Sequence, residues 1–358
     1  MKVYKIVGMM SGTSLDGLDL AYCHIWKNKG KWTFEIKCTD SVSYDQKMEK
    51  ELKDAIHLPA EKLLQLHNSY GTWLGEKANS FITDNDLEVD FIASHGHTSH
   101  HRPELGLTFQ LGSGQHLANA SQKKVICDFR TNDLALGGQG APLVPIGDQL
   151  IFGEYDFCLN LGGISNISFE VKDRRIAYDI GLANMILNYI TRKIDLDYDQ
   201  DGNMARSGVI NKNMLKELND LKYYLLPYPK SIGYEWFLEE VVPIVENTDD
   251  TIENLLHTSI HHICEKIAQQ VSLNSNKQKQ QLFITGGGAL NSFLIETLKQ
   301  KLDPKIEVVV PNKQLIEFKE ALVFALMGAL REEREINVLK TVTGAKRDSS
   351  SGVIFLPN

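Results

Sequence analysis

The sequence has few cysteines and no long apolar run, and each absence argues against a class of protein. The five cysteines among 358 residues form no CxxC pair and are too sparse for a disulfide framework, so we expect reduced thiols. No apolar run approaches the ~18 residues of a membrane span, and the first residues lack the apolar stretch of a signal peptide. A cytoplasmic protein without a membrane partner is expected.

An excess of basic residues is also missing. The formal net charge is -8 at pH 7, whereas proteins that bind nucleic acid or anionic lipid select basic surfaces. We therefore expect a small-molecule ligand and no nucleic-acid partner. At 358 residues the chain exceeds the size at which one hydrophobic core keeps growing, so two domains that meet at a cleft are expected.

Strand-like segments and amphipathic helices alternate, and a similar plan begins twice. In the first half we expect strands at 3–8, 89–94, 107–111 and 124–127 and a helix at 63–81. In the second half we expect strands at 157–161, 167–171, 175–180 and 282–285 and helices at 252–271, 290–302 and 315–334. A Gly/Pro-rich joint at 137–142 predicts the boundary between an N-terminal lobe, 1–135, and a C-terminal lobe, 136–358, whose extreme C-terminus is free to pack back on the first lobe.

Three glycine-rich turns each follow an apolar strand, at Gly8–Gly17, Gly162–Asn166 and Gly286–Asn291. Glycine lets a backbone come close to phosphate, and nearby hydroxyl and amide groups donate to its oxygens. One such turn alone would indicate an ordinary hairpin or helix start, but three together indicate a nucleotide. None matches the P-loop or the dinucleotide fingerprint.

The first turn also carries hydroxyls and carboxylates. Ser11, Thr13 and Ser14 suit a phosphate. Asp16 or Asp19 suits a hydrated Mg²⁺, which prefers oxygen ligands. For Asp16, bracing the turn is an equal alternative.

The densest histidine cluster is His95, His97, His100 and His101. No CxxC or HExxH motif accompanies it, so we expect a loop at a strand end that suits sugar hydroxyls rather than a zinc site. Arg130 suits a phosphate or a sugar, with a structural salt bridge as an equal alternative. His261 and His262 lie within the long helix, and we expect surface or partner residues there rather than ligands.

Short motifs run in order along nearly the whole chain. In the first half they are GTSLDGLD at 12–19, SHGHT at 94–98, DFR at 128–130 and GGQGAPLVP at 137–145. In the second half they are NLGGISN at 160–166, DG at 201–202, PKSIG at 229–233, TGGGALN at 285–291 and EALVFA at 320–325. This series resembles the anhydro-N-acetylmuramic acid kinase family.

The resemblance implies an α/β, two-lobed, actin-like (ribonuclease H-like) fold of duplicated topology, with ATP in a cleft between the lobes. It implies a homodimeric, ATP- and Mg²⁺-dependent sugar kinase of cell-wall recycling that opens the bridge of 1,6-anhydro-N-acetylmuramic acid with water and phosphorylates O6. By position, Asp179 matches the family's catalytic aspartate, the general base for that water. The residues alone place Asp179 at a strand end before Gly181, where a helix N-cap is the alternative.

Binding residues follow from the turns and the resemblance together. Those expected to bind ATP and its phosphates are Gly12, Thr13, Ser14, Leu15, Asp16, Gly17, Asp19, Gly162, Gly163, Asn166, Gly286, Gly287, Gly288 and Asn291. Those expected to bind the sugar are His95, Gly96, Arg130, Gln139 and Asn184. Asp16 is the expected Mg²⁺ ligand, directly or through water. The first lobe is expected to supply the sugar and phosphate side, and the second the nucleotide side with the catalytic Asp.

The chain departs from the family's pattern near the expected sugar side. DIGLAN at 179–184 stands where Asp-Thr-Gly-Pro-Gly-Asn is expected, which introduces Ile180 and Leu182. Tyr234 replaces a usual arginine, which can pair with a lactyl carboxylate as tyrosine cannot, and Asn188 replaces an acidic residue. Two alternatives therefore stay open: a kinase of another anhydro sugar such as levoglucosan, and a catalytically impaired nucleotide- or sugar-binding homologue.

Overall fold

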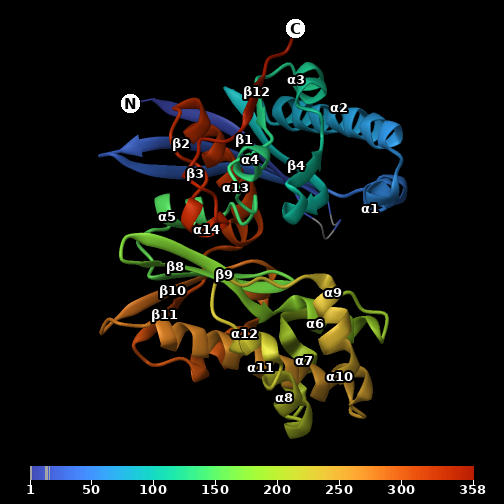
Figure 1. Ribbon diagram of the computed structural model, residues 1–358, viewed down its shortest axis with the longest axis vertical. Coiled ribbons are helices and arrows are strands. Elements are labelled where there is room, and N and C mark those ends of the chain that lie inside the picture. Colours follow the sequence, from blue (N-terminus) through green and yellow to red (C-terminus); the bar gives the residue numbers. More distant parts are fainter. Residues whose placement is uncertain (1, 13–14, 16) are drawn as a thin grey trace. The chain divides into compact units, whose positions relative to one another are not determined.

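The computed structural model describes residues 2–12, 15 and 17–358, which form two compact units (Figure 1). Unit 1 is Met1–Gly153 with Phe318–Asn358, and unit 2 is Glu154–Glu317. The boundary expected at 135/136 therefore falls inside unit 1. The last part of the chain, Phe318–Asn358, also belongs to unit 1, the side on which the extreme C-terminus was free to pack.

A buried carboxylate keeps the Gly/Pro-rich joint within unit 1. Asp133 Oδ2 accepts a hydrogen bond from the backbone N–H of Gly140 (2.8 Å), and its Oδ1 accepts one from Thr343 Oγ1 (2.8 Å). The backbone N–H of Gln139 donates to the carbonyl of Thr343 (2.8 Å). Glycine and proline mark a turn but not its partners, so the pattern alone did not distinguish this braced turn from a linker.

The described strands of unit 1 form one mixed sheet in the order β12-β6-β4-β1-β2-β3, with β5 paired to β4. The strands are β1 (Val3–Ser11), β2 (Leu18–Asn28), β3 (Lys31–Val42), β4 (Phe91–Arg102), β5 (Leu107–Leu111), β6 (Val125–Cys127) and β12 (Val353–Phe355). The pairs β1–β2 and β2–β3 are antiparallel, whereas β1–β4 and β4–β6 are parallel.

The sheet of unit 2 has the order β11-β10-β7-β8-β9. Its strands are β7 (Phe157–Leu161), β8 (Ile164–Val171), β9 (Arg174–Leu182), β10 (Gln280–Thr285) and β11 (Ile306–Val309). The pairs β7–β8 and β8–β9 are antiparallel, and β7–β10 and β10–β11 are parallel. Strands β1, β2, β3, β4 and β6 thus recur as β7 to β11, which is the duplicated topology of the actin-like fold.

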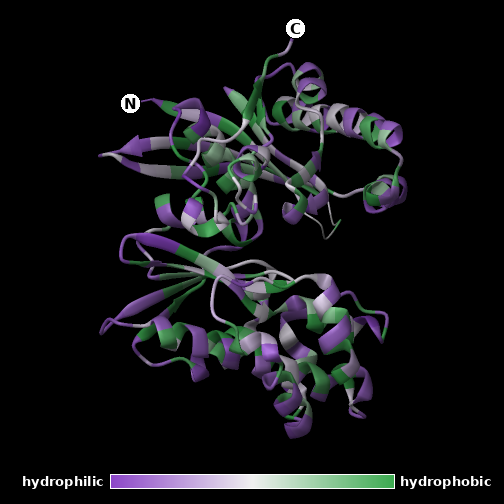
Figure 2. Ribbon diagram, in the orientation of Figure 1, coloured by the Kyte–Doolittle hydropathy of each residue, from purple (hydrophilic) through white to green (hydrophobic). Residues whose placement is uncertain are grey.

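The helices of unit 1 surround its sheet. They are α1 (Gln46–Asp54), η1 (Ala55–His57), α2 (Ala60–Asp84), η2 (Pro103–Leu105), α3 (Gly114–Ser121), α4 (Thr131–Ala135), α5 (Pro145–Leu150), α13 (Lys313–Glu332), most of which belongs to this unit, and α14 (Lys340–Thr343). Tyr70, Leu74, Ala78 and Phe81 recur at helical spacing on the buried side of α2, as predicted. Figure 2 shows this pattern as alternating green and purple bands along α2.

The helices of unit 2 include the predicted long amphipathic one. They are α6 (Asn184–Arg192), η3 (Gln200–Gly202), α7 (Asn203–Ser207), α8 (Lys212–Asn219), η4 (Lys222–Leu225), α9 (Tyr234–Trp236), the π-helical turn η5 (Phe237–Val241), α10 (Val242–Asn247), α11 (Ile252–Asn274), η6 (Gly287–Leu290) and α12 (Ser292–Lys301). Thr251 caps α11 by accepting from the N–H of Asn254. None of the described helices combines the length and the apolar character that crossing a bilayer requires.

Two expected loops are strands instead. The histidine-rich segment, expected as a loop, continues β4 to Arg102 because β5 pairs with it from His97 onward. Strand β8 begins at Ile164, so Asn166 lies within a strand rather than in a turn. Short-range patterns miss such extensions because the pairing partner comes later in the chain.

Close packing of α13 on β1 generates a stability prediction. A Cβ on Gly8 would overlap the carbonyl oxygen of Ala321, and backbone cannot rotate out of the way. We expect Gly8→Ala to lower the free energy of unfolding by ~3 kcal/mol or more in chemical denaturation. Gly30→Ala is the control: no atom of the described residues lies within 4 Å of its Cβ, and its φ of 82° opposes alanine at a cost of about 1 kcal/mol. Equal losses in the two variants would contradict the packing argument.

Candidate active site

Three polar side chains form a row across the sheet of unit 2. Asn160 on β7 is in register with Asn166 on β8, which is in register with Asp179 on β9. The adjacent Leu161 and Ile180 are buried in the hydrophobic core of the unit. Because side chains alternate along a strand, the polar row lies on the face opposite that core.

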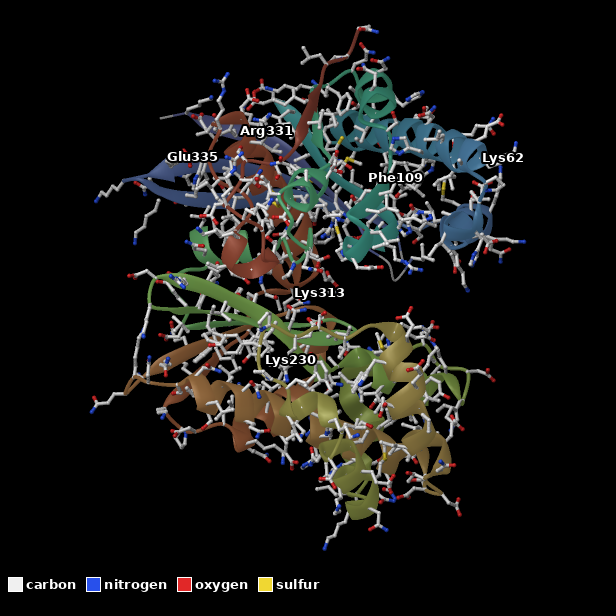
Figure 3. All side chains as sticks on the ribbon, in the orientation of Figure 1. Lys62, Phe109, Lys230, Lys313, Arg331 and Glu335 are labelled. Atoms are coloured by element: carbon white, nitrogen blue, oxygen red, sulfur yellow. The ribbon has the colours of Figure 1, made fainter. Side chains whose placement is uncertain are left out.

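The Asp179 carboxylate is half-buried and accepts a hydrogen bond from the backbone N–H of Ile232 at 3.1 Å. Burial raises the pKa of Asp179 to about 6, while the Ile232 N–H and the charge of Lys230 act to lower it. Lys230 is labelled in Figure 3. At neutral pH such a carboxylate is mostly ionised yet basic enough to take up a proton, as a general base must be.

The backbone of Asp179 is also held. Its N–H donates to the carbonyl of Lys230 (3.2 Å), and its carbonyl accepts from the hydroxyl of Tyr223 (2.7 Å). Lys230 in turn donates from Nζ to the carbonyl of Tyr223 (3.3 Å) and lies over that ring. Segment 223–232 therefore fixes both the backbone and the carboxylate of Asp179.

Asp179 does not cap a helix, because α6 begins at Asn184 with Ala183 at its N-cap. Ile180 and Leu182, the two departures beside it, are each only 1% exposed and belong to the core. These departures change the core face of β9, not the face that carries the carboxylate. The other two departures lie on helices: Asn188 is half-buried on α6, and Tyr234 is 57% exposed at the start of α9.

The turn Gly162-Gly163 joins β7 to β8 and contacts the start of α6. Its carbonyls accept from the N–H groups of Ala183, Asn184 and Met185, each at 3.0 Å. Neither glycine has a left-handed φ, and a Cβ on either would come no closer than 3.4 Å to described atoms beyond its chain neighbours. The packing of the described residues of unit 2 therefore does not require glycine here.

The turn Gly286–Gly288 lies against the end of β7. Gly286 has φ 82°, and a Cβ there would lie 2.6 Å from Asn160 Oδ1 and 2.8 Å from the carbonyl oxygen of Leu161. Asn184 Nδ2 donates to the same carbonyl at 3.1 Å. A Cβ on Gly287, in contrast, would make only an ordinary contact of 3.7 Å with Asn184. The two glycine turns and Asn184 thus meet at Asn160 and Leu161.

Asn291, expected to bind ATP from the first turn of a helix, is instead the N-cap of α12. Its Oδ1 accepts from the N–H of Leu294 at 2.9 Å, and a short 3₁₀ turn, η6, precedes it. The side-chain oxygen of Asn291 therefore already accepts the hydrogen bond that caps α12.

In unit 1 the first glycine turn is described in part. Gly12, Leu15 and Gly17 lie within the described residues, while the predicted phosphate and Mg²⁺ ligands Thr13, Ser14 and Asp16 lie outside them. Glycine is required at position 17 by φ 149° and by the carbonyl oxygen of Val42, 2.6 Å from a Cβ. Asp19 lies not in the turn but in β2, where its Oδ1 accepts from Ser41 Oγ at 2.6 Å.

Ser11, expected to face a phosphate, is buried below this turn. Its Oγ accepts from the hydroxyl of Tyr44 (2.7 Å) and contacts His97 Nδ1 (3.1 Å). Burial lowers the pKa of His97 to about 4, so the ring is neutral. His97 and Tyr44 anchor the end of β1 from which the turn begins.

His95, Gly96 and Arg130 are joined by hydrogen bonds. Arg130 donates from Nε to His95 Nε2 (3.0 Å) and from Nη1 to the carbonyl of Gly140 (2.6 Å). Because Nε2 accepts, His95 Nδ1 carries the proton and donates to the carbonyl of Gly96 (2.9 Å). Burial lowers the pKa of Arg130 to about 10, against the raising effect of Glu320 and Asp133, and lowers the pKa of His95 well below its usual range. The exposed Gln139 lies on the turn next to Gly140.

A cavity of about 180 Å³ in unit 1 includes two of these predicted sugar residues in its wall. It is lined by His67, His95, Gly96, Thr108, Phe109, Gln110, Leu111, Gly112, Gly114, Cys127, Asp128, Thr131, Val353 and Phe355. Phe109 is labelled in Figure 3. Burial lowers the pKa of His67, and its Nδ1 has no hydrogen-bond partner among the described residues.

Within the described part of the chain, no group of three or more His, Cys, Asp or Glu side chains is placed to hold a metal ion. The histidines of β4 bond to neighbouring groups instead: His100 to Ser99, and His101 to Thr108.

The predicted residues fall into two sets. Unit 1 holds the first turn, His95, Gly96, Arg130 and Gln139, and unit 2 holds Asp179, Asn184 and the two other glycine turns. Sequence reasoning missed Asn160 and Tyr223 as parts of these sites, whereas His97 was named within the histidine cluster. Asn160 had a signal, since it lies next to the end of an apolar strand before a glycine turn. Tyr223 gave none, because it is 44 positions from Asp179 in the chain.

Comparisons with known proteins identify the family of this chain. The family profile described as anhydro-N-acetylmuramic acid kinase matches residues 4–357. The protein of that name from Francisella tularensis subsp. novicida is 34% identical, covering 97% of each chain, and that from Aliivibrio fischeri is 34% identical, covering 99% of this chain and 100% of its own.

Solved structures resemble the chain more distantly. The activator of 2-hydroxyisocaproyl-CoA dehydratase from Clostridium difficile, with bound ADPNP, has 12% identity and a TM-score of 0.44 over 92% of this chain and 97% of its own. That likeness adds nothing to the repeated sheet order and the family match. From the family match and the relatives, this chain is a sugar kinase, a phosphotransferase, and it belongs to the anhydro-N-acetylmuramic acid kinase family.

Proposed function

We propose that this kinase uses ATP to open and phosphorylate 1,6-anhydro-N-acetylmuramic acid, giving N-acetylmuramic acid 6-phosphate in cell-wall recycling, with Asp179 as general base. The observation that carries the proposal is the half-buried carboxylate of Asp179, whose pKa of about 6 suits a base at neutral pH. Family membership and the names of the relatives support the substrate.

In the proposed reaction the oxygen of a water molecule bonds to the anomeric carbon while the bond from that carbon to O6 breaks. Asp179 takes the proton that the water loses. The freed O6 bonds to the γ-phosphorus of ATP, and ADP leaves with the electrons of the broken P–O bond. One water, one sugar and one ATP are consumed for each sugar phosphate and ADP.

The glycine turns are the proposed phosphate cradle. At Gly162, Gly163 and Gly287 the protein leaves room for a Cβ, so the small residue is explained by a phosphate that approaches the backbone. Asn166 extends this surface beside Asp179. Gly12, Leu15, Gly17 and Asp19, with Thr13, Ser14 and Asp16 outside the described residues, are also proposed to bind ATP or its phosphates. The same is proposed for Gly286, Gly288 and Asn291 of the third turn.

Mg²⁺ is proposed as the cation, with Asp16 as its ligand, directly or through water. A hydrated Mg²⁺ needs only one or two carboxylates beside the phosphates, which suits a site without a cluster of three protein ligands among the described residues. When bound, the ion neutralises charge on the transferring phosphoryl group.

The sugar is proposed to bind His95, Gly96, Arg130, Gln139 and Asn184. The cavity that His95 and Gly96 line supports this assignment for unit 1. Arg130 fixes the orientation of the His95 ring by donating a hydrogen bond to it. The core positions of Ile180 and Leu182 remove the ground for expecting impaired catalysis from those two residues.

A cytoplasmic homodimer is proposed as the working form. The five cysteines are all free thiols, which suits a reducing compartment. Support for the dimer is the family resemblance.

Removal of the proposed base is the primary test. We expect Asp179→Asn to lower sugar-dependent release of ADP from ATP and Mg²⁺ by ~10²-fold or more, because the amide cannot accept the proton. The assay compares anhydro-N-acetylmuramic acid, levoglucosan and no sugar. Asp173→Asn, an exposed carboxylate at the tip of the same β8–β9 hairpin, is the control and should keep full activity. Unchanged turnover in Asp179→Asn would refute the base, and turnover with levoglucosan alone would change the substrate.

The pH dependence tests the same carboxylate. Because Asp179 must be ionised to act, kcat/KM should fall as pH drops through about 6. Lys230→Met removes a positive charge that lowers this pKa, so the acid limb should move to higher pH. Lys222→Met, an exposed lysine of η4, should leave the limb in place. If Lys230→Met does not move the acid limb, the limb does not report the ionisation of Asp179.

The phosphate cradle predicts a selective effect of alanine. Gly163→Ala should fold with a free energy of unfolding within about 1 kcal/mol of wild type, because the backbone tolerates a Cβ there. Its KM for ATP should rise by about 10-fold or more, which corresponds to ~1.4 kcal/mol. Gly106→Ala, where nothing lies within 4 Å of the Cβ, should keep the KM of wild type. A normal KM in Gly163→Ala would argue against a ligand at this turn.

A further inference from the structure

Two consecutive tyrosines of η4 contact the backbone of β9 at and just beyond Asp179, and neither takes part in the proposed chemistry. The Tyr223 hydroxyl donates to the carbonyl of Asp179 at 2.7 Å. The Tyr224 ring covers Gly181, where a Cβ would lie 2.6 Å from ring carbon Cε1 and 2.7 Å from the hydroxyl oxygen.

An ion pair fixes the direction of the hydrogen bonds behind Tyr224. Glu265 accepts from Lys301 Nζ (2.9 Å) and from the side-chain amide of Asn219 (2.9 Å). A carboxylate only accepts, so the amide nitrogen of Asn219 faces Glu265 and its Oδ1 faces His262 Nδ1 at 2.9 Å. His262 Nδ1 therefore carries the proton, and Nε2 is an acceptor.

Tyr224 consequently donates its hydroxyl proton to His262 Nε2, 2.8 Å away. His262 is fully buried in α11, which corrects the expectation of a surface or partner residue. Burial lowers the pKa of His262 to about 3, so the ring stays neutral and keeps its acceptor at neutral pH. The Tyr224 hydroxyl is thereby anchored to α11 while its ring lies over Gly181 of β9.

We propose that Tyr223 and Tyr224 are positioning residues that fix the backbone of β9 at Asp179 and Gly181 and thereby hold the Asp179 carboxylate at the Ile232 N–H. Three observations support this: the bond from Tyr223 to Asp179, the fit of the Tyr224 ring over Gly181, and the directed chain that anchors Tyr224 to α11. The inference rests on the proposed role of Asp179 as general base.

The test removes one hydroxyl at a time, in Tyr223→Phe and Tyr224→Phe, and so keeps both rings. We expect kcat to fall by roughly 10-fold or more, because a small misplacement of a catalytic group is costly, with KM for ATP unchanged. The acid limb of kcat/KM should move to higher pH, since a weaker bond from Ile232 lowers the pKa of Asp179 less.

Tyr178→Phe is the matched control. Tyr178 lies on the same strand, and its hydroxyl donates to Gln270 of α11 at 2.8 Å without contacting the backbone of Asp179. We expect this variant to lose a similar amount of stability in chemical denaturation but to keep the kcat and acid limb of wild type.

The outcomes separate the two hypotheses. Wild-type kcat and acid limb in both η4 variants, or the same loss in Tyr178→Phe, would overturn the positioning role while Asp179→Asn still abolishes activity. An active Asp179→Asn would instead refute the base itself. If one η4 variant fails to fold, the other decides, because Tyr223 bonds to Asp179 whereas Tyr224 packs over Gly181 and bonds to His262.

Discussion

The half-buried carboxylate of Asp179 on β9 is the group that several other segments of unit 2 hold in place. Burial raises the pKa of Asp179 from 3.8 to about 6, so ionising this group opposes folding. The contribution of Asp179 to stability is therefore fully present below about 3.8 and is lost as pH rises through about 6. The backbone N–H of Ile232 and the charge of Lys230 lower this pKa and so favour the ionised carboxylate. Surrounding segments hold those two groups in place.

Because side chains alternate along β9, the proposed catalytic residue and the residues that stabilise the core lie on opposite faces of the strand. Asp179 lies on one face of the strand, while Ile180 and Leu182 lie on the face that packs in the core. A residue pattern that departs from the family's can therefore change the core without changing the carboxylate's surroundings. The glycines divide in a similar way: Gly8, Gly17 and Gly286 are required by neighbouring backbone, whereas Gly162, Gly163 and Gly287 have free space beside them.

Much of the fold could be predicted from the sequence because its signals are local. Apolar runs predicted β1 and β4 to β10, helical spacing predicted α2 and α11, and the family resemblance of the ordered motifs implied the actin-like topology. The joint at 137–142 was misjudged because its partner Thr343 lies far along the chain, and the end of β4 was misjudged because pairing with β5 extends it. The same limit applies to the site: Asp179 lies near the end of an apolar strand, but nothing local to it indicates that Ile232 and Tyr223 hold it.

Gly181 and Tyr224 have a consequence for how this protein can evolve. The aromatic ring occupies the space that any side chain at position 181 would fill. A larger residue at 181 is tolerated only after the ring at 224 has become smaller, and a smaller residue at 224 leaves a void unless 181 grows. The two positions, 43 apart in the sequence, are thus expected to change together across descendants of this chain, as a pair of correlated substitutions.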